Sequence, residues 1–171
     1  KFEYIAIAGS SGGHILPAIK FINELSNYKN PDTILFITSE VGQRFQDKII
    51  NSNINVLEFK TSNKIKFILD ILITLFPIFI KNKKLNLIGF GGFLTSPILY
   101  FAKIFNLFFF SFNKIYIHEQ NYVFGLANKL NYFISHKVFT SFPTTKFLKK
   151  EIYVGNFFND INNFKFTKNE K

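Results

Sequence analysis

The sequence predicts an α/β protein with a Rossmann-like, doubly wound and mostly parallel sheet of about seven strands. Apolar runs of strand length alternate with helix-length segments along nearly the whole chain, which is the pattern of successive βαβ units. The strand candidates are continuous apolar runs, as expected for parallel strands that are buried on both faces. The length of 171 residues is sufficient for one domain with a sizeable core.

The first half of the chain alternates regularly between the two kinds of segment. A glycine-rich turn follows the first apolar run, and Pro17 lies in the first turn of the helix expected after it, where proline is tolerated. A later segment carries apolar residues at helical spacing. The expected strands of this half are residues 3–8, 33–38, 55–59 and 85–89, and the expected helices are residues 15–26, 43–51 and 64–81.

The second half continues the alternation. Thr95 or Ser96 is expected to cap a helix that has Pro97 at its first position. The apolar pattern is lost after residue 158, so we expect residues 1–158 to form one domain and residues 159–171 to be a linker. The expected strands of this half are residues 114–117, 137–140 and 151–154, and the expected helices are residues 96–106 and 124–133.

The composition excludes several classes of function. The net charge is +10, but it comes almost entirely from scattered lysines, with Arg44 as the only arginine. A nucleic-acid-binding protein more often uses arginine along one face, so we expect no nucleic-acid partner. Lysines beside apolar residues, as at Lys81, Lys83 and Lys84, instead favour an anionic membrane surface. The chain has no cysteine and only three histidines, which lack ligand spacing, so we expect no metal and no cofactor.

No segment is expected to span a membrane. The most apolar stretches are residues 67–80 and 98–112, which are shorter than the roughly 18 to 20 apolar residues of a spanning helix. Asp70 and Lys103 also interrupt them. The first apolar run is too short for a signal peptide. We therefore expect a soluble or peripheral protein.

The first candidate functional loop is the turn Gly9-Ser10-Ser11-Gly12-Gly13-His14, between a strand and a helix. This layout can hold a phosphate on free backbone N–H groups. Its glycine spacing matches neither the dinucleotide fingerprint nor the P-loop, and a plain tight turn is the alternative. His14 lies at the helix N-terminus, where the dipole disfavours imidazolium, so a neutral ring is expected to act as a base. The alternative is a structural histidine that donates to a nearby carbonyl.

The second loop also joins a strand to a helix. Helix capping accounts for Thr95, Ser96 and Pro97, but it does not account for three glycines within four positions, at Gly89, Gly91 and Gly92. Glycines in this pattern favour a close approach between the backbone and a ligand.

The third loop, His118-Glu119-Gln120-Asn121, follows the apolar strand at 114–117 directly. The carboxyl edge of a parallel sheet is the ligand edge, and a polar cluster there favours a binding site. The alternative for Glu119 is a helix cap or dipole partner. Asn128 lies further along, after Gly125. The three loops are expected to converge on one crevice.

Together these motifs resemble the MurG family of peptidoglycan glycosyltransferases. The motifs are Gly-x-x-Gly-Gly-His-x-x-Pro from Gly9, Gly-x-Gly-Gly-x-x-x-x-Pro from Gly89, His-Glu-Gln-Asn from His118, and Val154-Gly155-Asn156. The resemblance covers the amino-terminal half of that family. It implies half of a GT-B fold that binds the acceptor, together with a carboxyl-terminal donor domain that this chain lacks.

The resemblance also implies a reaction and a set of site residues. The reaction is inverting transfer of N-acetylglucosamine from UDP-N-acetylglucosamine to an undecaprenyl-diphosphate lipid acceptor, lipid I, at the cytoplasmic face of the bacterial plasma membrane. His14 and Glu119 are the implied catalytic residues. The implied acceptor-diphosphate residues are Gly9, Ser10, Gly89, Gly91 and Gly92, the donor residues are Ser11, Gly12, Gly13, Asn121 and Asn159, and the supporting residues are His118, Gln120 and Asn128.

Two departures and two other classes of protein bear on this interpretation. The first loop has Ser11 where the family has threonine, and Phe157, Phe158 and Asn159 stand where it has Pro-x-Arg. A non-catalytic acceptor-binding or membrane-anchoring module that partners a separate donor-binding subunit is the alternative function. A nucleotide-binding oxidoreductase is disfavoured because no acidic residue ends the second strand.

Overall fold

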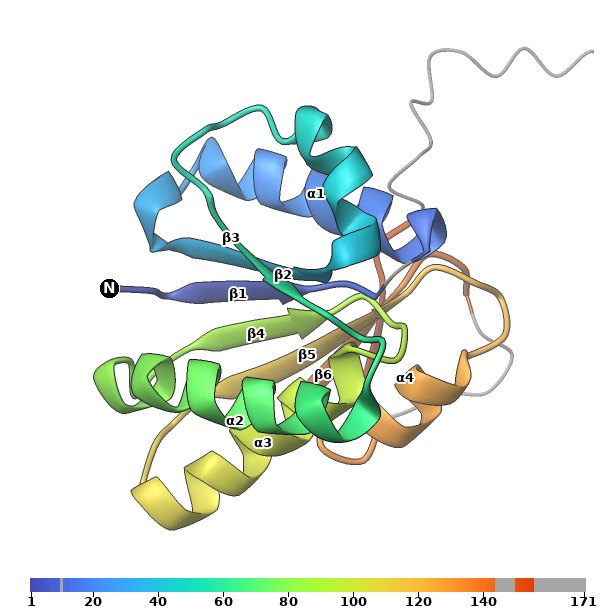
Figure 1. Cartoon of the computed structure of the whole chain (residues 1–171). Helices are drawn as coiled ribbons and strands as arrows, with labels where there is room; N and C mark the ends of the chain where they lie inside the picture. Colours follow the sequence, from blue (N-terminus) through green and yellow to red (C-terminus); the bar gives the residue numbers. More distant parts are fainter. Residues whose placement is uncertain (10, 144–149, 156–171) are drawn as a thin grey trace, which may run out of the picture.

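The computed structural model describes residues 1–9, 11–143 and 150–155. Its strands form one sheet in the order β3-β2-β1-β4-β5-β6-β7, and every neighbouring pair is parallel. The prediction of a doubly wound, parallel α/β sheet is therefore confirmed (Figure 1). The strands are β1 (Tyr4–Ile7), β2 (Ile34–Ser39), β3 (Asn55–Phe59), β4 (Asn86–Gly89), β5 (Lys114–Glu119), β6 (Lys137–Thr140) and β7 (Glu151–Tyr153).

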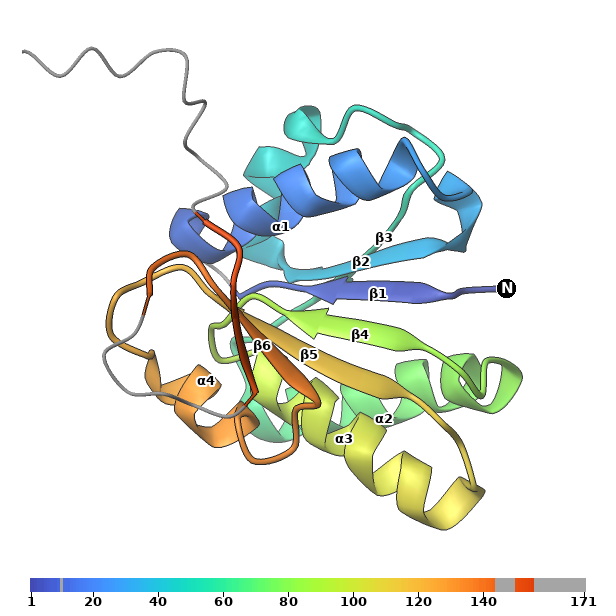
Figure 2. The ribbon, with the colours of Figure 1, turned by 180° about the vertical axis from the view of Figure 1, so that it is seen from behind.

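The helices cover the two faces of the sheet. Helix α1 and the 3-10 helix η2 lie on one face, whereas α2, α3 and α4 lie on the other (Figures 1 and 2). None of the described helices is long and apolar enough to cross a membrane. The α-helices are α1 (Gly12–Ser26), α2 (Lys64–Lys81), α3 (Thr95–Phe109) and α4 (Leu126–Asn131), and the 3-10 helices are η1 (Pro31–Thr33) and η2 (Glu40–Lys48).

The chain order creates a switch point between β1 and β4. The chain runs outward from β1 to β3, crosses back through α2 to β4 on the other side of β1, and then continues outward to β7. Loops that leave β1 and β4 at their carboxyl ends therefore diverge from one place. Such a switch point is where open α/β sheets bind their ligands.

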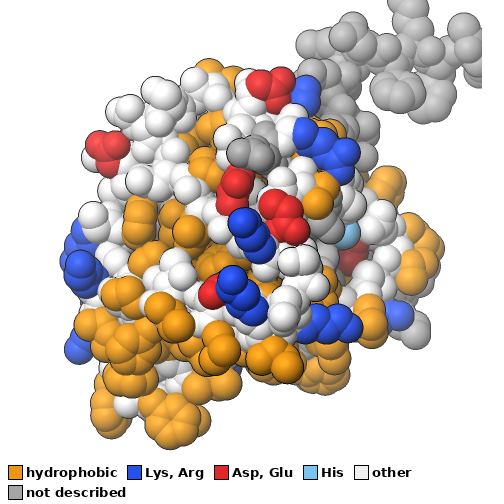
Figure 3. Space-filling view, in the orientation of Figure 1, with side chains coloured by type: hydrophobic (Ala, Val, Ile, Leu, Met, Phe, Trp, Pro, Cys, Tyr) orange, Lys and Arg blue, Asp and Glu red, His pale blue; other side chains and the backbone are white. Residues whose placement is uncertain are grey.

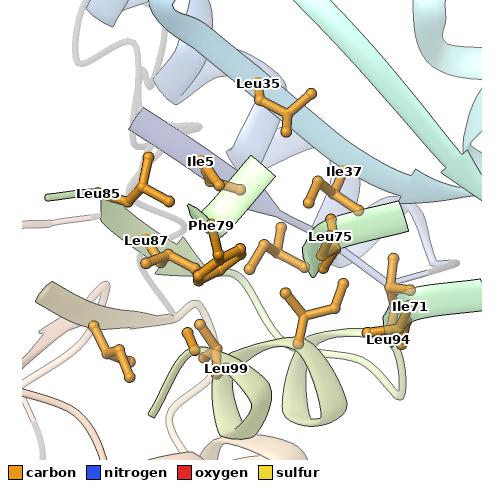
Figure 4. Packing of buried hydrophobic residues seen from close by; sticks show 14 of the residues in the cluster. Ile5, Leu35, Ile37, Ile71, Leu75, Phe79, Leu85, Leu87, Leu94 and Leu99 are labelled. Carbon is orange, nitrogen blue, oxygen red and sulfur yellow. The ribbon is translucent and has the colours of Figure 1, made fainter. Parts of the chain in front are cut away.

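The core depends on one apolar stripe of α2. Phe67, Ile71, Leu75 and Phe79, four residues apart, are fully buried against the sheet, as an amphipathic helix requires. Figure 4 shows Ile71, Leu75 and Phe79 pointing toward side chains of β1, β2 and β4. A second cluster, between α1 and the opposite face of the sheet, includes Ile15, Ile19, Phe36 and Phe90.

The predictions for the first two helical segments differ from the structure. The segment expected to be an α-helix at 43–51 is the 3-10 helix η2. Its residue Gly42 packs against β2, since a Cβ atom there would lie only 2.2 Å from Oγ1 of Thr38. Helix α1 starts at residue 12, three residues earlier than expected, because the carbonyl of Ser11 already accepts from the N–H groups of His14 and Ile15. Pro17 consequently lies inside the helix.

Strand β5 is two residues longer than predicted. His118 and Glu119 pair with Phe139 and Thr140 of β6, so they belong to the sheet and not to the loop after it. Both side chains are buried. Nε2 of His118 lies 3.1 Å from Oγ of Ser141, and its ring packs against Phe90 at a centroid distance of 5.3 Å. His118 is therefore a component of the core.

The burial of His118 predicts a loss of stability in mild acid. Burial lowers the pKa of His118 from 6.5 to about 4, so between these values the unfolded ring binds a proton that the folded ring does not. The free energy of unfolding should therefore fall as the pH drops from 6.5 to 4, by roughly 3 kcal/mol from this residue. Urea denaturation across this range measures the slope, and His118→Gln, which cannot titrate, is the control. Equal slopes for the two proteins would contradict the prediction.

Candidate functional site

The two glycine turns touch each other at the switch point. The N–H of Gly9 donates to the carbonyl of Gly91 at 2.9 Å. A Cβ atom on Gly9 would lie 2.7 Å from Cα of Gly92, and one on Gly92 would lie 2.7 Å from Cα of Gly9. Gly92 also has a φ of 87°, a conformation that favours glycine. Contact between the two turns, and not only approach to a ligand, therefore requires these glycines.

Thr95 stabilises the second turn in a way that the sequence did not suggest. Thr95 is the first residue of α3 and not its cap. Its hydroxyl donates to the carbonyl of Gly91 at 2.7 Å, and a Cβ atom on Gly89 would lie 2.3 Å from its methyl carbon. The expected capping by Thr95 or Ser96 is wrong, because the N-cap position is Leu94 and has no side-chain hydrogen bond. Thr95 instead stabilises the turn by a hydrogen bond between the start of α3 and Gly91.

His14 brings the first loop into contact with the second and near the third. Its Nδ1 lies 2.5 Å from the hydroxyl oxygen of Ser11. Its opposite edge lies against Gly91, where a Cβ atom would approach Cδ2 to 2.7 Å and Nε2 to 2.9 Å. The amide nitrogen of Asn128 lies 3.7 Å from the same point. The convergence of the three loops at one edge is therefore confirmed.

The ring of His14 is held neutral by its surroundings. Partial burial lowers the pKa of His14 below 6.5, and the nearby carboxylate of Glu119 opposes this shift with a smaller effect. The ring was expected to be neutral because of the helix dipole, whereas the main cause is desolvation. A neutral imidazole at physiological pH can accept a proton.

Glu119 is the centre of the third loop. Its side chain is 1% exposed. Oε1 accepts from the N–H of Asn121 at 2.9 Å and from its amide nitrogen at 3.1 Å. Oε2 accepts from the N–H of Gly125 at 2.9 Å and from the amide of Asn128 at 3.0 Å. These four bonds fix the path of residues 120–128.

Asn128 connects this loop to β5 and to His14. It is buried at the start of α4, and its amide nitrogen donates to the carbonyl of His118 at 2.9 Å as well as to Glu119. The same nitrogen lies next to the Gly91–His14 contact. Asn128 therefore links the Glu119 loop to β5 and places its amide beside Gly91, which the ring of His14 also contacts.

The remaining predicted residues occupy three environments. Ser11, Gly13 and Asn121 are exposed, and Gly12 and Gln120 are half-buried. Ser10, Asn156 and Asn159, together with the expected linker at 159–171, lie outside the described residues. Sequence reasoning missed Ser141, the partner of His118, although its position directly after β6 placed it at the ligand edge.

The hydrogen-bonding groups at this edge suit an anionic, hydroxyl-bearing ligand. They are backbone N–H groups at the start of α1, amide side chains and a neutral imidazole. Within the described parts of the chain, no group of three or more His, Cys, Asp or Glu side chains is arranged to hold a metal ion. This edge thus offers hydrogen bonds and, in His14, a proton acceptor.

Comparisons with known proteins agree with this geometry. The model of the glycosyltransferase family 28 N-terminal domain matches residues 4–140. A Wolbachia relative from Brugia malayi is 31% identical over 160 residues, which are 91% of this chain and 44% of the relative. A relative from Prochlorococcus marinus strain MIT 9515 is 32% identical over 86% of this chain and 41% of its own length. Both bear the name UDP-N-acetylglucosamine–N-acetylmuramyl-(pentapeptide) pyrophosphoryl-undecaprenol N-acetylglucosamine transferase.

The fold has a counterpart among solved structures. The crystal structure of Acinetobacter baumannii MurG matches with a TM-score of 0.66 and 19% identity, over 89% of this chain and 45% of that one. The chain thus spans less than half the length of these relatives. With a family match over most of its length and the expected loops at the expected edge, the chain belongs to glycosyltransferase family 28, to its amino-terminal domain.

Proposed function

We propose that this domain is the acceptor-binding half of an inverting N-acetylglucosaminyltransferase of peptidoglycan synthesis. The donor is UDP-N-acetylglucosamine, and the acceptor is undecaprenyl-diphospho-N-acetylmuramoyl-pentapeptide, lipid I, which becomes lipid II. The observation that carries the proposal is that a neutral His14, in the first glycine turn, lies against Gly91 of the second turn, which the amide of Asn128 also borders. The names of the relatives support the choice of substrates.

His14 acts as the general base in this proposal. The C4 hydroxyl oxygen of the muramoyl unit attacks C1 of the donor sugar, and the bond from C1 to the UDP oxygen breaks with its electron pair on UDP. The hydroxyl proton passes to Nε2 of His14. Nε2 is suited to this step because it makes no hydrogen bond with the described residues.

The phosphates of both substrates are bound by backbone N–H groups. The N–H groups of Gly12 and Gly13 open α1 and have no helical partner, and such N–H groups favour anions. Together with Ser11 and Asn121 they face the donor. The turns around Gly9, Gly91 and Gly92 face the acceptor diphosphate, with Gly89 packing behind them and Ser10 and Asn159 as further contacts.

The reaction requires a second domain in this proposal. The described residues supply a base, but the groups that stabilise the departing UDP are assigned to a donor-binding domain, to which residues 159–171 are the linker. The relatives, which are more than twice as long as the matched part, support this division.

An exposed apolar surface on α2 and α3 is the proposed membrane contact. Helix α2 exposes Ile65, Leu69, Ile73 and Phe76, whereas Phe79 belongs to its buried stripe. Figure 3 shows apolar side chains gathered over α2 and α3, with basic side chains beside them. The exposed apolar residues at the end of α3 and beyond it are Leu107, Phe108, Phe109, Phe110 and Phe112.

The size and rim of this surface favour a lipid bilayer. Large exposed apolar patches on soluble domains mark interaction sites, and the exposed Lys64, Lys66, Lys81, Lys83 and Lys84 lie at the two ends of α2. Apolar side chains with a basic rim suit an anionic bilayer. We propose that the domain binds peripherally to the cytoplasmic face of the plasma membrane, where its lipid acceptor lies.

Removal of the base should abolish most of the transfer. His14→Ala, made in the protein that joins this domain to a donor domain, should lower kcat by about 10²-fold or more and change the KM for the acceptor little. Release of UDP with a lipid I analogue is the measurement. Glu24→Ala, at the exposed far end of α1, is the control and should leave kcat unchanged. A His14→Ala enzyme within a few-fold of the wild type would show that His14 is structural.

Glu119 is proposed to position the loop and not to exchange protons. Glu119→Gln turns an NH₂ group toward the donors of Gly125 and Asn128, or of Asn121, and should lower the free energy of unfolding by roughly 2 kcal/mol or more. The backbone N–H groups of Asn121 and Gly125 donate to Glu119. Their hydrogen exchange should accelerate in this variant. The exposed Glu24→Gln is the control. Unchanged stability and exchange with lost turnover would instead indicate a direct role in the chemistry.

Membrane binding should depend on the lysines beside α2. Lys83→Glu with Lys84→Glu should weaken co-sedimentation with anionic vesicles by roughly 30-fold or more, since each lysine contributes on the order of 1 kcal/mol. The matched control is Lys29→Glu with Lys48→Glu, on the other face of the sheet, which changes the charge equally. Equal loss in both proteins, or equal binding of the wild type to neutral vesicles, would contradict the electrostatic contribution of this surface.

A further inference from the structure

Ser11 occupies the N-cap position of α1 without using its side chain as a cap. Its backbone is extended, with φ −93° and ψ 146°, and its side chain makes no capping hydrogen bond. An N-cap serine ordinarily accepts from the N–H of the second or third helical residue. Here the backbone carbonyl of Ser11 accepts from the N–H groups of His14 and Ile15, each at 3.0 Å. The hydroxyl is therefore left for another partner.

That partner is the ring of His14, three residues along the chain. The hydroxyl oxygen of Ser11 lies 2.5 Å from Nδ1, a short distance even for a strong hydrogen bond. Gly91, which has no side chain, lies beside the opposite edge of the ring, at Cδ2 and Nε2. A rotation of the ring by 180° would put a carbon atom at Ser11 and lose the hydrogen bond. Ser11 consequently determines which ring nitrogen lies on the side of Gly91 and Asn128.

The tautomer of a neutral histidine is set by the hydrogen bond of its other nitrogen. A serine oxygen can accept as well as donate. If Nδ1 carries the proton and donates it to Ser11, Nε2 retains a lone pair for an incoming hydroxyl. If Ser11 donates to Nδ1, the proton is on Nε2 and the ring is not a base at that atom.

We propose that Ser11 is the positioning residue for His14: its hydroxyl accepts the Nδ1 proton and holds the ring with an unprotonated Nε2 toward Gly91 and Asn128. This role rests on the proposed transferase function and adds to it a group that selects the reactive tautomer. The hydroxyl proton of Ser11 then points away from the ring and is available to an oxygen atom of the bound sugar nucleotide. Donor binding and base orientation are thereby joined in one side chain.

Nuclear magnetic resonance of the ring nitrogens tests this without any turnover. In the 171-residue chain with ¹⁵N-labelled histidine, above pH 7, His14 should carry its proton on Nδ1. Ser11→Ala should shift the population toward the Nε2–H form, whereas Ser11→Thr, which keeps the hydroxyl, should restore the Nδ1–H form. Ser26→Ala is the matched control, because it removes a hydroxyl at the other end of the same helix.

A kinetic arm tests the consequence in the protein that carries both domains. Ser11→Ala should lower kcat by about 10-fold or more and leave the KM for the acceptor nearly unchanged, and Ser11→Thr should recover most of kcat. A wild-type ring that is protonated on Nε2, or a tautomer that does not respond to Ser11→Ala, overturns the proposal. An Nδ1–H ring in a protein that transfers no sugar would instead refute the proposed function and leave the hydrogen bond established.

Discussion

The contact between two backbone turns at the switch point is the constraint on which the site depends. Gly9 and Gly92 approach so closely that neither can carry a side chain, and the hydrogen bond from Gly9 to Gly91 joins the ends of β1 and β4. The same contact leaves Gly91 open on one side, and the ring of His14 fills that space. The position of the proposed base thus follows from how β1 and β4 end. The turns after them touch because neither Gly9 nor Gly92 has a side chain, and His14 packs beside that contact.

A buried carboxylate supplies the second constraint. Glu119 lies in β5 and gathers the amides of Asn121, Gly125 and Asn128 around its two oxygens. A buried charge is costly unless hydrogen bonds satisfy it, and here four donors do so. The loop and α4 are therefore held to the sheet by a group that has no acceptor capacity left for a substrate. This arrangement explains how exposed Asn121 and buried Asn128 keep fixed places beside Glu119.

The two ends and faces of the domain are specialised for different surroundings. The carboxyl edge of the sheet carries hydrogen-bonding groups and a neutral imidazole, whereas α2 and α3 turn one apolar stripe inward and another outward. An isolated domain ordinarily covers most of its large apolar side chains. The outward stripe and the polar edge together fit the proposed role of an enzyme half that takes a lipid-borne acceptor from a bilayer.

The sequence by itself determined the parallel sheet, α2 from Lys64 to Lys81, and the edge at which the three loops lie, because alternating apolar segments and glycine turns are local signals. It placed β5 two residues short, since His118 and Glu119 are polar residues that local pattern assigns to a loop. Only the tertiary structure decided that both are buried and that Ser11 bonds to His14. It also decided that Gly9 must lack a side chain, because Gly92 packs directly against it. These features depend on contacts between segments far apart in the chain, or on the choice between two hydrogen bonds open to one hydroxyl, and periodicity encodes neither.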